Sequence, residues 1–225
     1  MAQATSALWD ELWRKSGTER EYGFDINGVW YGPDQEISHS VSSELYPEFG
    51  IGNATAASLK MSLFSSGIPR GATIKRFIRL KNGAQVSEWL PKGVFFINRR
   101  AKDGDRWSIE AFDAMRKAEA VWEPDQSIPF PLTMPNAVKE FARIMGISID
   151  SRTYLDASYT IDYPANNYTI RDELRFIAAA HAGNWVITDA GELLLVPLIS
   201  SPKETNYLVT EKGDAITFGG VRILV

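Results

Sequence analysis

The feature that most constrains the fold of this chain is a series of short alternating segments between Tyr22 and Asp113. Segment 54–64 (ATAASLKMSLF) is representative, because Leu59, Met61 and Leu63 fall on one face and polar residues on the other. This period of two is typical of a half-buried strand. The further predicted strands are 22–26, 29–32, 36–45, 72–80, 86–90, 93–100 and 106–113.

Turn signals separate these segments at intervals of about 8–12 residues, as in antiparallel sandwiches and barrels. Asn27-Gly28 is a strong hairpin signal, and KNGAQ (81–85) and KDGD (102–105) are further turns. We therefore predict a β-rich chain with a closed or nearly closed antiparallel barrel over residues 18–122. Asp113 is expected to cap a short helix after the last strand.

A short helix is predicted before the barrel, over residues 5–15, with Thr5 as a candidate cap. Leu8, Trp9, Leu12 and Trp13 form one apolar stripe on it. Two tryptophans cannot be buried within so short a helix. They must pack on the body of this chain or on a neighbour, so Trp9 and Trp13 are candidate partner-docking residues.

A second unit follows a stretch with four prolines in fourteen residues, 123–136. A helix is predicted from Pro135 to a stop at Gly146, and another from Thr169, capped together with Asp172, to a stop at Gly183. Their apolar stripes are Val138, Phe141, Ala142 and Met145 in the first, and Leu174, Ile177, Ala178 and His181 in the second. Segments 184–188 and 192–198 are expected to pair as a hairpin. These elements predict a small α+β domain of two helices on a little sheet.

The predicted organisation is therefore a helical arm (1–17), a barrel (18–122), a proline-rich linker (123–134), the α+β domain (135–198) and C-terminal strands (199–225). The last segment ends in VRILV, an apolar and strand-like sequence. Chain ends are more often polar and frayed. We therefore expect residues 199–225 to begin a second barrel.

Composition narrows the classes of function. The formal net charge is −4 and the sequence pI about 5.3, which disfavours a dedicated nucleic-acid binder. The chain contains no cysteine, so a disulfide scaffold, a thiol nucleophile and a cysteine-bound zinc ion are excluded. The N-terminus has no signal-peptide pattern, and no apolar run is long enough to span a membrane. We expect a soluble protein made in the cytoplasm.

The two histidines are weak candidates for chemistry. His181 could act as a base or ligand beside Asp189 and Glu192. Its place at the end of a helix favours a structural role instead, with the ring bonded to a free carbonyl. His39 lies in a predicted strand of the other domain. Two separate histidines do not supply the three or four ligands that zinc needs.

Other candidate binding motifs in the sequence are incomplete. Asp103 and Asp105 lack the remaining ligands of a calcium loop, and Gly50-x-Gly52 lacks the rest of a dinucleotide fingerprint. Two basic groups are better interpreted as strand faces or interfaces than as a nucleic-acid patch; they are Lys75, Arg76, Arg79 and Lys81, and Arg99, Arg100 and Lys102. We expect no catalytic, cofactor-binding or metal-binding residues, which favours an assembly role.

At this point the sequence resembles a known family. The blocks GNATAASLKMSL (52–63), IPRGATIK (68–75) and PKGVFFI with FDAM (91–97 and 112–115) are similar to the N-terminal part of tail proteins from prophages of Gram-positive bacteria. Segments 134–153 and 168–198 are similar to the part that follows. The family is that of baseplate hub, or tail-tip, proteins.

The resemblance implies a virion structural protein that acts by assembly rather than turnover. The hub is a trimer in which each subunit supplies two tube-type barrels to a ring of six. It joins the tail tube and distal-tail ring to the spike or fibre machinery, while DNA and the tape-measure protein pass through its lumen without specific binding. The second barrel is incomplete in 225 residues, so this chain is expected to be monomeric where a longer form is a homotrimer.

One alternative stays open from the residues themselves. A tail-associated cell-wall hydrolase or glycan-binding module would need a cleft with clustered acids or aromatic rings. The candidate residues are Asp150, Asp156, Asp162, Tyr154, Tyr159, Tyr163 and Tyr168.

Overall fold

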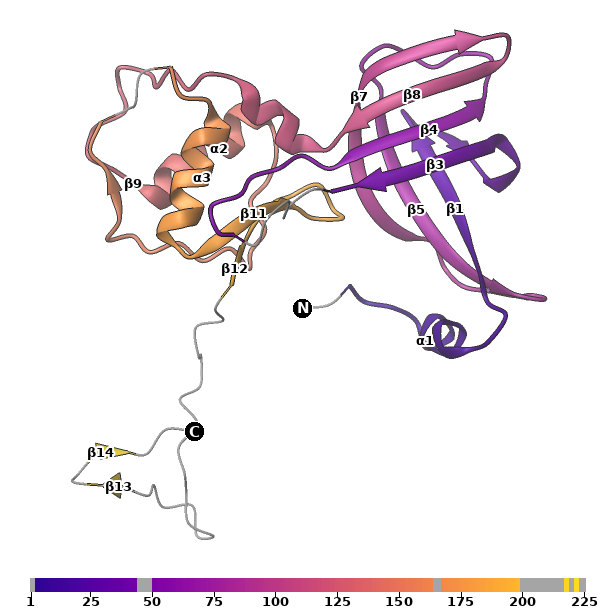
Figure 1. Cartoon of the computed structure of the whole chain (residues 1–225), viewed down its shortest axis with the longest axis horizontal. Coiled ribbons are helices and arrows are strands. Elements are labelled where there is room, and N and C mark those ends of the chain that lie inside the picture. The colour runs from indigo at the N-terminus through magenta and orange to yellow at the C-terminus, as the bar shows by residue number, and fades with distance from the viewer. Residues whose placement is uncertain (1–2, 44–49, 164–166, 199–216, 219–220, 223–225) are drawn as a thin grey trace.

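The computed structural model describes residues 3–43, 50–163, 167–198, 217–218 and 221–222. Two lobes lie side by side: a β-barrel, and a smaller lobe of helices and short strands (Figure 1). The β-rich, α+β fold class predicted from the sequence is confirmed.

The barrel is one antiparallel sheet. Its elements are β1 (Glu19–Ile26), β2 (Val29–Tyr31), η1 (Pro33–Gln35), β3 (Glu36–Ser42), β4 (Ser58–Phe64), β5 (Thr73–Asn82), β6 (Gln85–Val86), β7 (Leu90–Asp103) and β8 (Arg106–Phe112). The hydrogen-bonded order is β2-β1-β5-β7-β8-β4-β3, with β6 paired to β5. The sheet curls so that β3, at one end of this order, approaches β1, near the other end. The ring centroids of His39 on β3 and Tyr22 on β1 are 4.3 Å apart.

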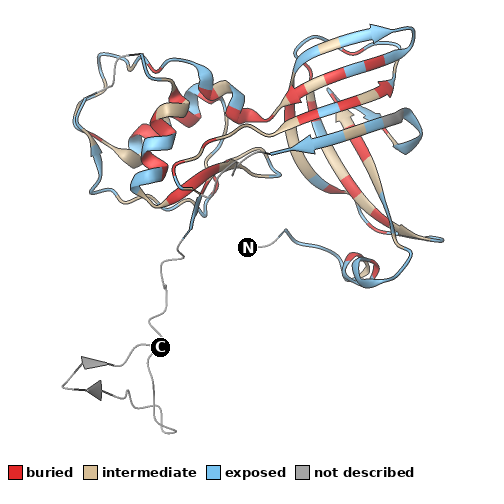
Figure 2. Cartoon of the chain, in the orientation of Figure 1, coloured by how far each residue is buried: buried red, intermediate tan, exposed pale blue. Residues whose placement is uncertain are grey.

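Strand alternation fills the barrel interior. Along β4, Leu59, Met61 and Leu63 are buried while Lys60 and Phe64 are exposed, as the sequence pattern predicts. Figure 2 shows the same alternation along neighbouring strands. The buried interior residues are Phe24, Ile26, Tyr31, Leu59, Met61, Leu63, Ile68, Ala72, Ile74, Phe95, Trp107, Ile109 and Ala111.

The predicted hairpin between β1 and β2 is present. Asn27 and Gly28 have φ angles of 51° and 84°, the positive values that a type I′ turn requires. The Asp25 carboxylate accepts a hydrogen bond of 2.6 Å from the Gly28 N–H. The Asn27 side chain accepts one of 2.9 Å from the Thr73 N–H, which ties the turn to β5.

Helix α1 (Ala7–Arg14) packs against the barrel. Its cap is Ser6 rather than the expected Thr5, since the Ser6 hydroxyl accepts from the Trp9 N–H at 3.1 Å. Glu88 holds the start of the helix by accepting hydrogen bonds from the Ser6 N–H (2.8 Å) and hydroxyl (2.6 Å). Trp9 and Leu12 are buried in a cluster with barrel residues Ile78, Leu80 and Leu90.

The second lobe is built from η2 (Ala114–Glu119), β9 (Leu132–Thr133), α2 (Met134–Met145), β10 (Thr160–Ile161), α3 (Ile170–Ala180), β11 (Gly183–Ile187) and β12 (Leu193–Pro197). Asp113 caps η2, and Gly146 ends α2 at a φ of 64°. Thr169 and Asp172 form the expected capping box on α3. The pairing of β9 with β10 was not predicted, because each strand has only two residues.

Gly183 is not the stop of α3, which corrects the sequence prediction. The left-handed residue after the helix is Ala182, with φ 48°, and Gly183 is already the first residue of β11. Its glycine identity has another cause. A Cβ at position 183 would lie 2.9 Å from the Val196 carbonyl oxygen on the paired strand.

The core of the second lobe includes side chains from the segment before β4 and from the segment after β8. Ala54, Met115, Ala118 and Trp122 are buried in it together with residues of α2, α3, β11 and β12. Ala54 also bridges to Trp185 in parallel. The chain therefore visits this lobe between β3 and β4, and returns to it after β8. The domain boundaries given above remain a prediction.

At the C-terminal end the described residues are β13 (Thr217–Phe218) and β14 (Val221–Arg222), which pair antiparallel. The rest of 199–225, where a second barrel is expected to begin, lies outside the described residues.

Candidate interaction surfaces

His181 uses both ring nitrogens inside the fold. Nδ1 lies 2.9 Å from the Ile177 carbonyl oxygen and donates to it, and Nε2 accepts from the Asp156 N–H, also at 2.9 Å. Asp189 pairs instead with Lys92, at 2.9 Å. The ring thus joins the end of α3 to the loop at Asp156, the structural role that its position at a helix end suggests.

The acids of the 150–162 loop are engaged with neighbouring residues. Hydrogen bonds from the Arg152 side chain and backbone N–H lower the pKa of Asp150 to about 2. Hydrogen bonds from the Ser158 N–H and hydroxyl lower the pKa of Asp156. Asp162 lies 3.4 Å from the Thr160 hydroxyl. A glycosidase needs a general acid whose pKa is raised, and neither Asp150 nor Asp156 meets that requirement.

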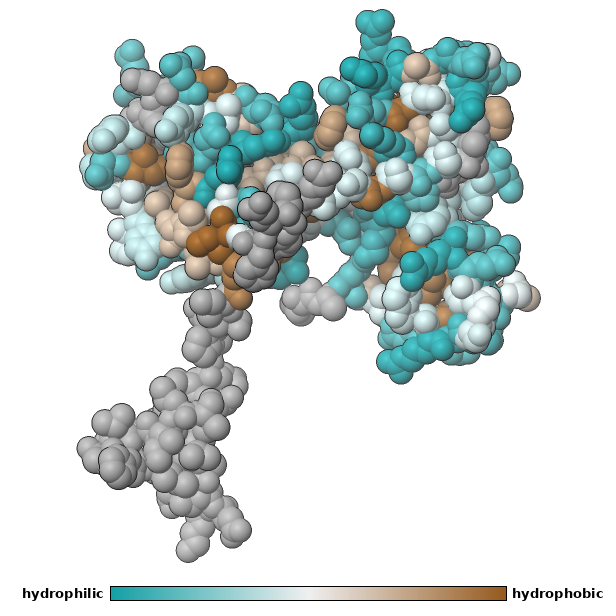
Figure 3. Space-filling model, viewed as in Figure 1, coloured by the Kyte–Doolittle hydropathy of each residue, from teal (hydrophilic) through white to brown (hydrophobic). Residues whose placement is uncertain are grey.

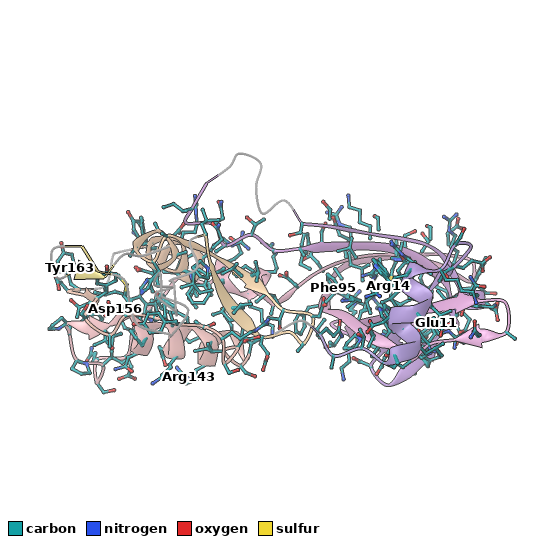
Figure 4. The ribbon with its side chains drawn as sticks, turned by 90° about the horizontal axis from the view of Figure 1, so that it is seen from below. Glu11, Arg14, Phe95, Arg143, Asp156 and Tyr163 are labelled. Carbon is teal, nitrogen blue, oxygen red and sulfur yellow. The ribbon has the colours of Figure 1, made fainter. Side chains whose placement is uncertain are left out.

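The tyrosines of the same region divide into two kinds. Tyr154 and Tyr163 are each 76% exposed, and Tyr163 and Asp156 lie at the end of this lobe far from the barrel (Figure 4). Tyr159 packs edge-on against His181, and Tyr168 stacks on Phe176 with centroids 5.5 Å apart. The loop therefore offers exposed rings beside two carboxylates, Asp150 and Asp156, whose pKa values are lowered.

Among the described residues, no group of three or more His, Cys, Asp or Glu side chains is placed to hold a metal ion. Asp103 lies at the end of β7 and Asp105 in the turn to β8, where Gly104 has a φ of 58°. Gly52, with φ 80°, packs on α3, where a Cβ would meet the Arg175 carbonyl and Ala179 at 3.2 Å.

The basic residues are mostly tied to their own fold. Arg79 and Lys81 form ion pairs with Glu21 at 2.6 and 3.0 Å. Arg100 lies over the Trp107 ring and donates to the Ile68 carbonyl, and Lys102 donates to the Ser66 carbonyl. The strand-face interpretation of these groups agrees with these contacts.

The two tryptophans proposed for docking differ in their surroundings. Trp9 is 7% exposed and belongs to the cluster between α1 and the barrel, whereas Trp13 is 57% exposed. The Arg20 guanidinium lies over the Trp13 ring at 4.9 Å. Of these two tryptophans, only Trp13 presents a ring that a partner could cover.

A second aromatic group lies on the outer face of the barrel and was missed from the sequence. Trp30 on β2 lies directly over Gly23 on β1, where a Cβ would approach the ring to 2.3 Å. Its ring centroid is 5.4 Å from that of Phe77 and 5.1 Å from that of Trp89. Arg79 covers the Trp89 ring at 4.5 Å. We call Trp30, Phe77 and Trp89 the aromatic knob.

A signal for the knob was present in the sequence. In segment 72–80, Ile74, Ile78 and Leu80 define the buried face, so Phe77 falls on the polar face with Lys75 and Arg79. An aromatic residue out of phase on a strand indicates a ring directed to the surface or to a partner. What the sequence could not supply was the register that brings Trp30 and Trp89 beside it.

The outer face of the opposite strands carries a hollow of about 600 Å3. Its floor is a row of small residues that lie directly across from one another on four strands. They are Ser38 on β3, Ser62 on β4, Ser108 on β8 and Ala101 on β7. We call this row the serine hollow. The next row, Lys60, Glu110 and Arg99, forms a charged wall beside it.

The connection between the lobes is held by Asp113. Its carboxylate accepts hydrogen bonds of 2.9 Å from the N–H groups of Ala57 and Met115. Burial outweighs these bonds and raises the pKa of Asp113 to about 6. A cavity of about 170 Å3 adjoins it, lined in part by Thr55, Lys92 and Asp189. The Lys92–Asp189 ion pair adds a second link between the lobes.

No helix in the described part of the chain has the length and apolar character needed to cross a membrane.

Comparison with known proteins shows which structures share this fold. The chain matches no protein-family profile and no curated protein. It is similar in structure to the 43 kDa tail protein of prophage MuSo2 from Shewanella oneidensis, with a TM-score of 0.54 and 13% identity over 89% of this chain. It is also similar to a tail protein from Neisseria meningitidis MC58, with a TM-score of 0.55 and 14% identity over 78% of this chain.

The chain spans 61% of the length of the Shewanella protein and 50% of the Neisseria protein. The match to the first covers most of the described residues, so it includes both lobes. The chain thus has, in its described part, a fold shared with proteins of phage tails.

Proposed function

We propose that this chain is a structural component of a phage or prophage tail that works by assembly with other tail proteins. The observation that carries the proposal is the structural match to a prophage tail protein over 89% of the chain. A match limited to the barrel would carry much less weight, because barrels serve many unrelated functions.

The finer proposal is a baseplate hub or tail-tip component that links the tail tube to the spike or fibre machinery. The residues that resemble hub proteins support it, together with the order of a barrel followed by a small α+β lobe. On this proposal the partners are distal-tail and tube proteins, a spike or fibre and the tape measure, within a homotrimer of the full-length protein. DNA passes through the lumen without specific binding, in keeping with the net charge of −4.

A non-enzymatic role is part of the proposal. It is supported by the state of Asp150 and Asp156, whose carboxylates are occupied by Arg152 and Ser158. The rival is a cell-wall hydrolase or glycan-binding module, favoured by the exposed rings of Tyr154 and Tyr163. Digestion of purified cell wall separates hydrolysis from assembly, with Asp150→Ala and Asp156→Ala as matched variants. Hydrolysis that either substitution abolishes would overturn the assembly role as the whole function.

Disruption of the gene in a host that releases these particles tests the assembly role. The proposal predicts heads without attached tails, or tails of abnormal length, and rescue when the intact gene is supplied. Normal, infective particles from the disrupted strain would contradict it.

A further inference from the structure

The part of the barrel formed by β7 and loop 65–72 carries a hollow of about 450 Å3. It forms where β7 runs past the start of β5. Thr73, the first residue of β5, pairs with Phe96, and beyond this point the loop lies beside β7 in place of a strand. In Figure 1, β7 and β8 form the upper part of the barrel, and on the face shown in Figure 3 this part is mainly hydrophilic.

Three arginines line the hollow together with Asn98 and Trp107. Arg70 comes from the loop, and Arg99 and Arg100 come from β7. Asn98 is an extra residue of β7 in its pairing with β8, and such a bulge redirects the side chains beside it. Arg99 and Arg100 therefore line the same hollow, although neighbouring residues of a regular strand face opposite sides. We call this site the arginine hollow.

Arg100 is held in place by contacts within the barrel. Its guanidinium lies 5.1 Å from the centroid of the Trp107 ring and donates to the Ile68 carbonyl. The Trp107 ring is fixed in turn, because its Nε1–H donates to the Ser65 carbonyl at 2.9 Å. A guanidinium carries five N–H donors, so the bond to Ile68 leaves donors of Arg100 for a ligand. The site is thus positioned before any partner arrives.

Arg70 and Arg99 carry charges that the fold leaves unmatched. Both are exposed, and neither has a hydrogen bond or an ion pair in the part of the chain that the structure describes. Arg79, by contrast, is paired with Glu21 at 2.6 Å. Three positive charges around one hollow repel one another, and an anion placed between them offsets that repulsion.

The lining favours carboxylate side chains as the ligand. The planar guanidinium fork matches a carboxylate through two parallel hydrogen bonds. A volume of about 450 Å3 admits one or two side chains. A polyanion such as a nucleic acid would extend beyond the hollow, towards Asp103 and Asp105 in the turn and Glu110 on β8. Those acids, and a net charge of −4, would repel it.

We propose that the arginine hollow binds one or two Asp or Glu side chains of a neighbouring tail protein. The inference rests on the proposed assembly function and adds to it one contact surface and the chemistry that this surface recognises. A contact of this kind contributes more to the choice and orientation of the partner than to the total affinity.

Binding of a short acidic peptide to the purified chain tests the proposal. The probe is a capped tetrapeptide with two central glutamates, titrated at constant ionic strength and followed by NMR of the arginine and tryptophan side-chain N–H groups. The matched control probe has glutamine in place of both glutamates. The expected result is a saturable shift of the Arg70, Arg99 and Arg100 signals with the acidic peptide and none with the control.

Substitutions show whether these arginines carry the binding. Arg70→Gln and Arg99→Gln each remove a charged donor group and should weaken binding of the acidic peptide about tenfold, a loss typical of a hydrogen bond to a charged group. Arg14→Gln makes the same change of charge on α1, away from β7 and β8 (Figure 1). It should alter the binding less than about twofold, because exposed charges far apart are screened by salt. Unfolding curves of all variants confirm that the barrel is intact.

Two further probes distinguish a protein carboxylate from other anions. Inorganic phosphate and a single-stranded oligothymidylate are titrated in the same way. Tighter binding of either one than of the acidic peptide would overturn the assignment to Asp or Glu side chains of a protein. The absence of saturable shifts, or equal shifts with the glutamine peptide, would overturn the site itself.

Charge reversal in the particle tests whether a tail protein uses the hollow. In a host whose gene is disrupted, a supplied gene with Arg99→Glu should give at least several-fold fewer infective particles than one with Arg14→Glu. Equal yields from these two variants would overturn the inference. Normal particles from the disrupted strain without any supplied gene would instead contradict the proposed tail function, so the two failures are told apart.

Discussion

Asp113 and Ala57 are joined by two hydrogen bonds, one between backbone groups and one to the Asp113 side chain, where the chain passes between its lobes. The Asp113 N–H donates to the Ala57 carbonyl at 2.9 Å, and the Asp113 carboxylate accepts from the Ala57 N–H at 2.9 Å. The same carboxylate caps η2 through Met115. One buried acid thus fixes both chain segments that connect the lobes.

This arrangement predicts a pH-dependent stability. The pKa of Asp113 is about 6 in the folded protein, against 3.8 for an ordinary aspartate. Between these values the folded state binds more protons than the unfolded state, so the free energy of unfolding falls as pH rises from 4 to 6 and then levels off. A shift of about two pKa units corresponds to about 3 kcal/mol.

Asp113→Asn isolates this contribution, because asparagine keeps a capping oxygen and does not titrate. Denaturant unfolding between pH 4 and 7 should show a stability difference, wild type minus variant, that decreases with pH. Other acids, such as Asp150 with its lowered pKa, have opposite slopes, but they cancel in the difference. A difference that stays constant across this range would show that burial of Asp113 does not govern its ionisation.

The two tryptophans of α1 should respond differently to truncation. Trp9→Ala opens the buried cluster with Ile78 and Leu80 and should destabilise the protein by about 3–5 kcal/mol. Trp13→Ala removes a ring that is 57% exposed and should cost less than about 1 kcal/mol. Equal losses, measured by chemical unfolding, would show that α1 packs on the barrel in another way.

Gly23 and Trp30 should be energetically coupled. Gly23→Ala places a Cβ 2.3 Å from the present position of the Trp30 ring, so the ring must move and the barrel loses stability. In a Trp30→Ala background the same Gly23→Ala change should cost much less, because only the Trp89 ring, at 3.2 Å, then remains close to the new Cβ. A double-mutant cycle should give a coupling of about 0.5–3 kcal/mol, whereas additive effects would mean that the ring does not rest on the glycine.

The His181 ring should protect one amide of the neighbouring loop. His181→Phe keeps a ring but loses the acceptor for the Asp156 N–H and the donor to Ile177, at a cost of about 1–2 kcal/mol. Hydrogen exchange at the Asp156 amide should accelerate more than at Ser158, whose N–H bonds to the Asp156 side chain. Unchanged exchange at Asp156 would contradict the assigned role of the ring.

Features set by residues close together in the sequence were predicted well. Features that depend on strand pairing between distant segments were missed. The Thr169–Asp172 capping box, the helix end at Gly146 and the Asn27-Gly28 turn each depend on a few neighbouring residues. They can therefore be predicted from the sequence. The participation of Ala54 in the second core, and the glycine at 183 that faces Val196, depend on partners far along the chain. The same limit applied to the surfaces, because the knob and the serine hollow exist only once strand pairing sets Trp30 beside Phe77 and Ser62 beside Ser108.

The most direct test of the account is the position of this protein in the virus particle. Antibodies raised against the purified chain and coupled to gold are applied to particles released from the host and viewed by electron microscopy. The account predicts label confined to the tail, and at its tip if the hub proposal is right. Particles whose tails carry no label, with the protein recovered only from the host-cell fraction, would contradict it.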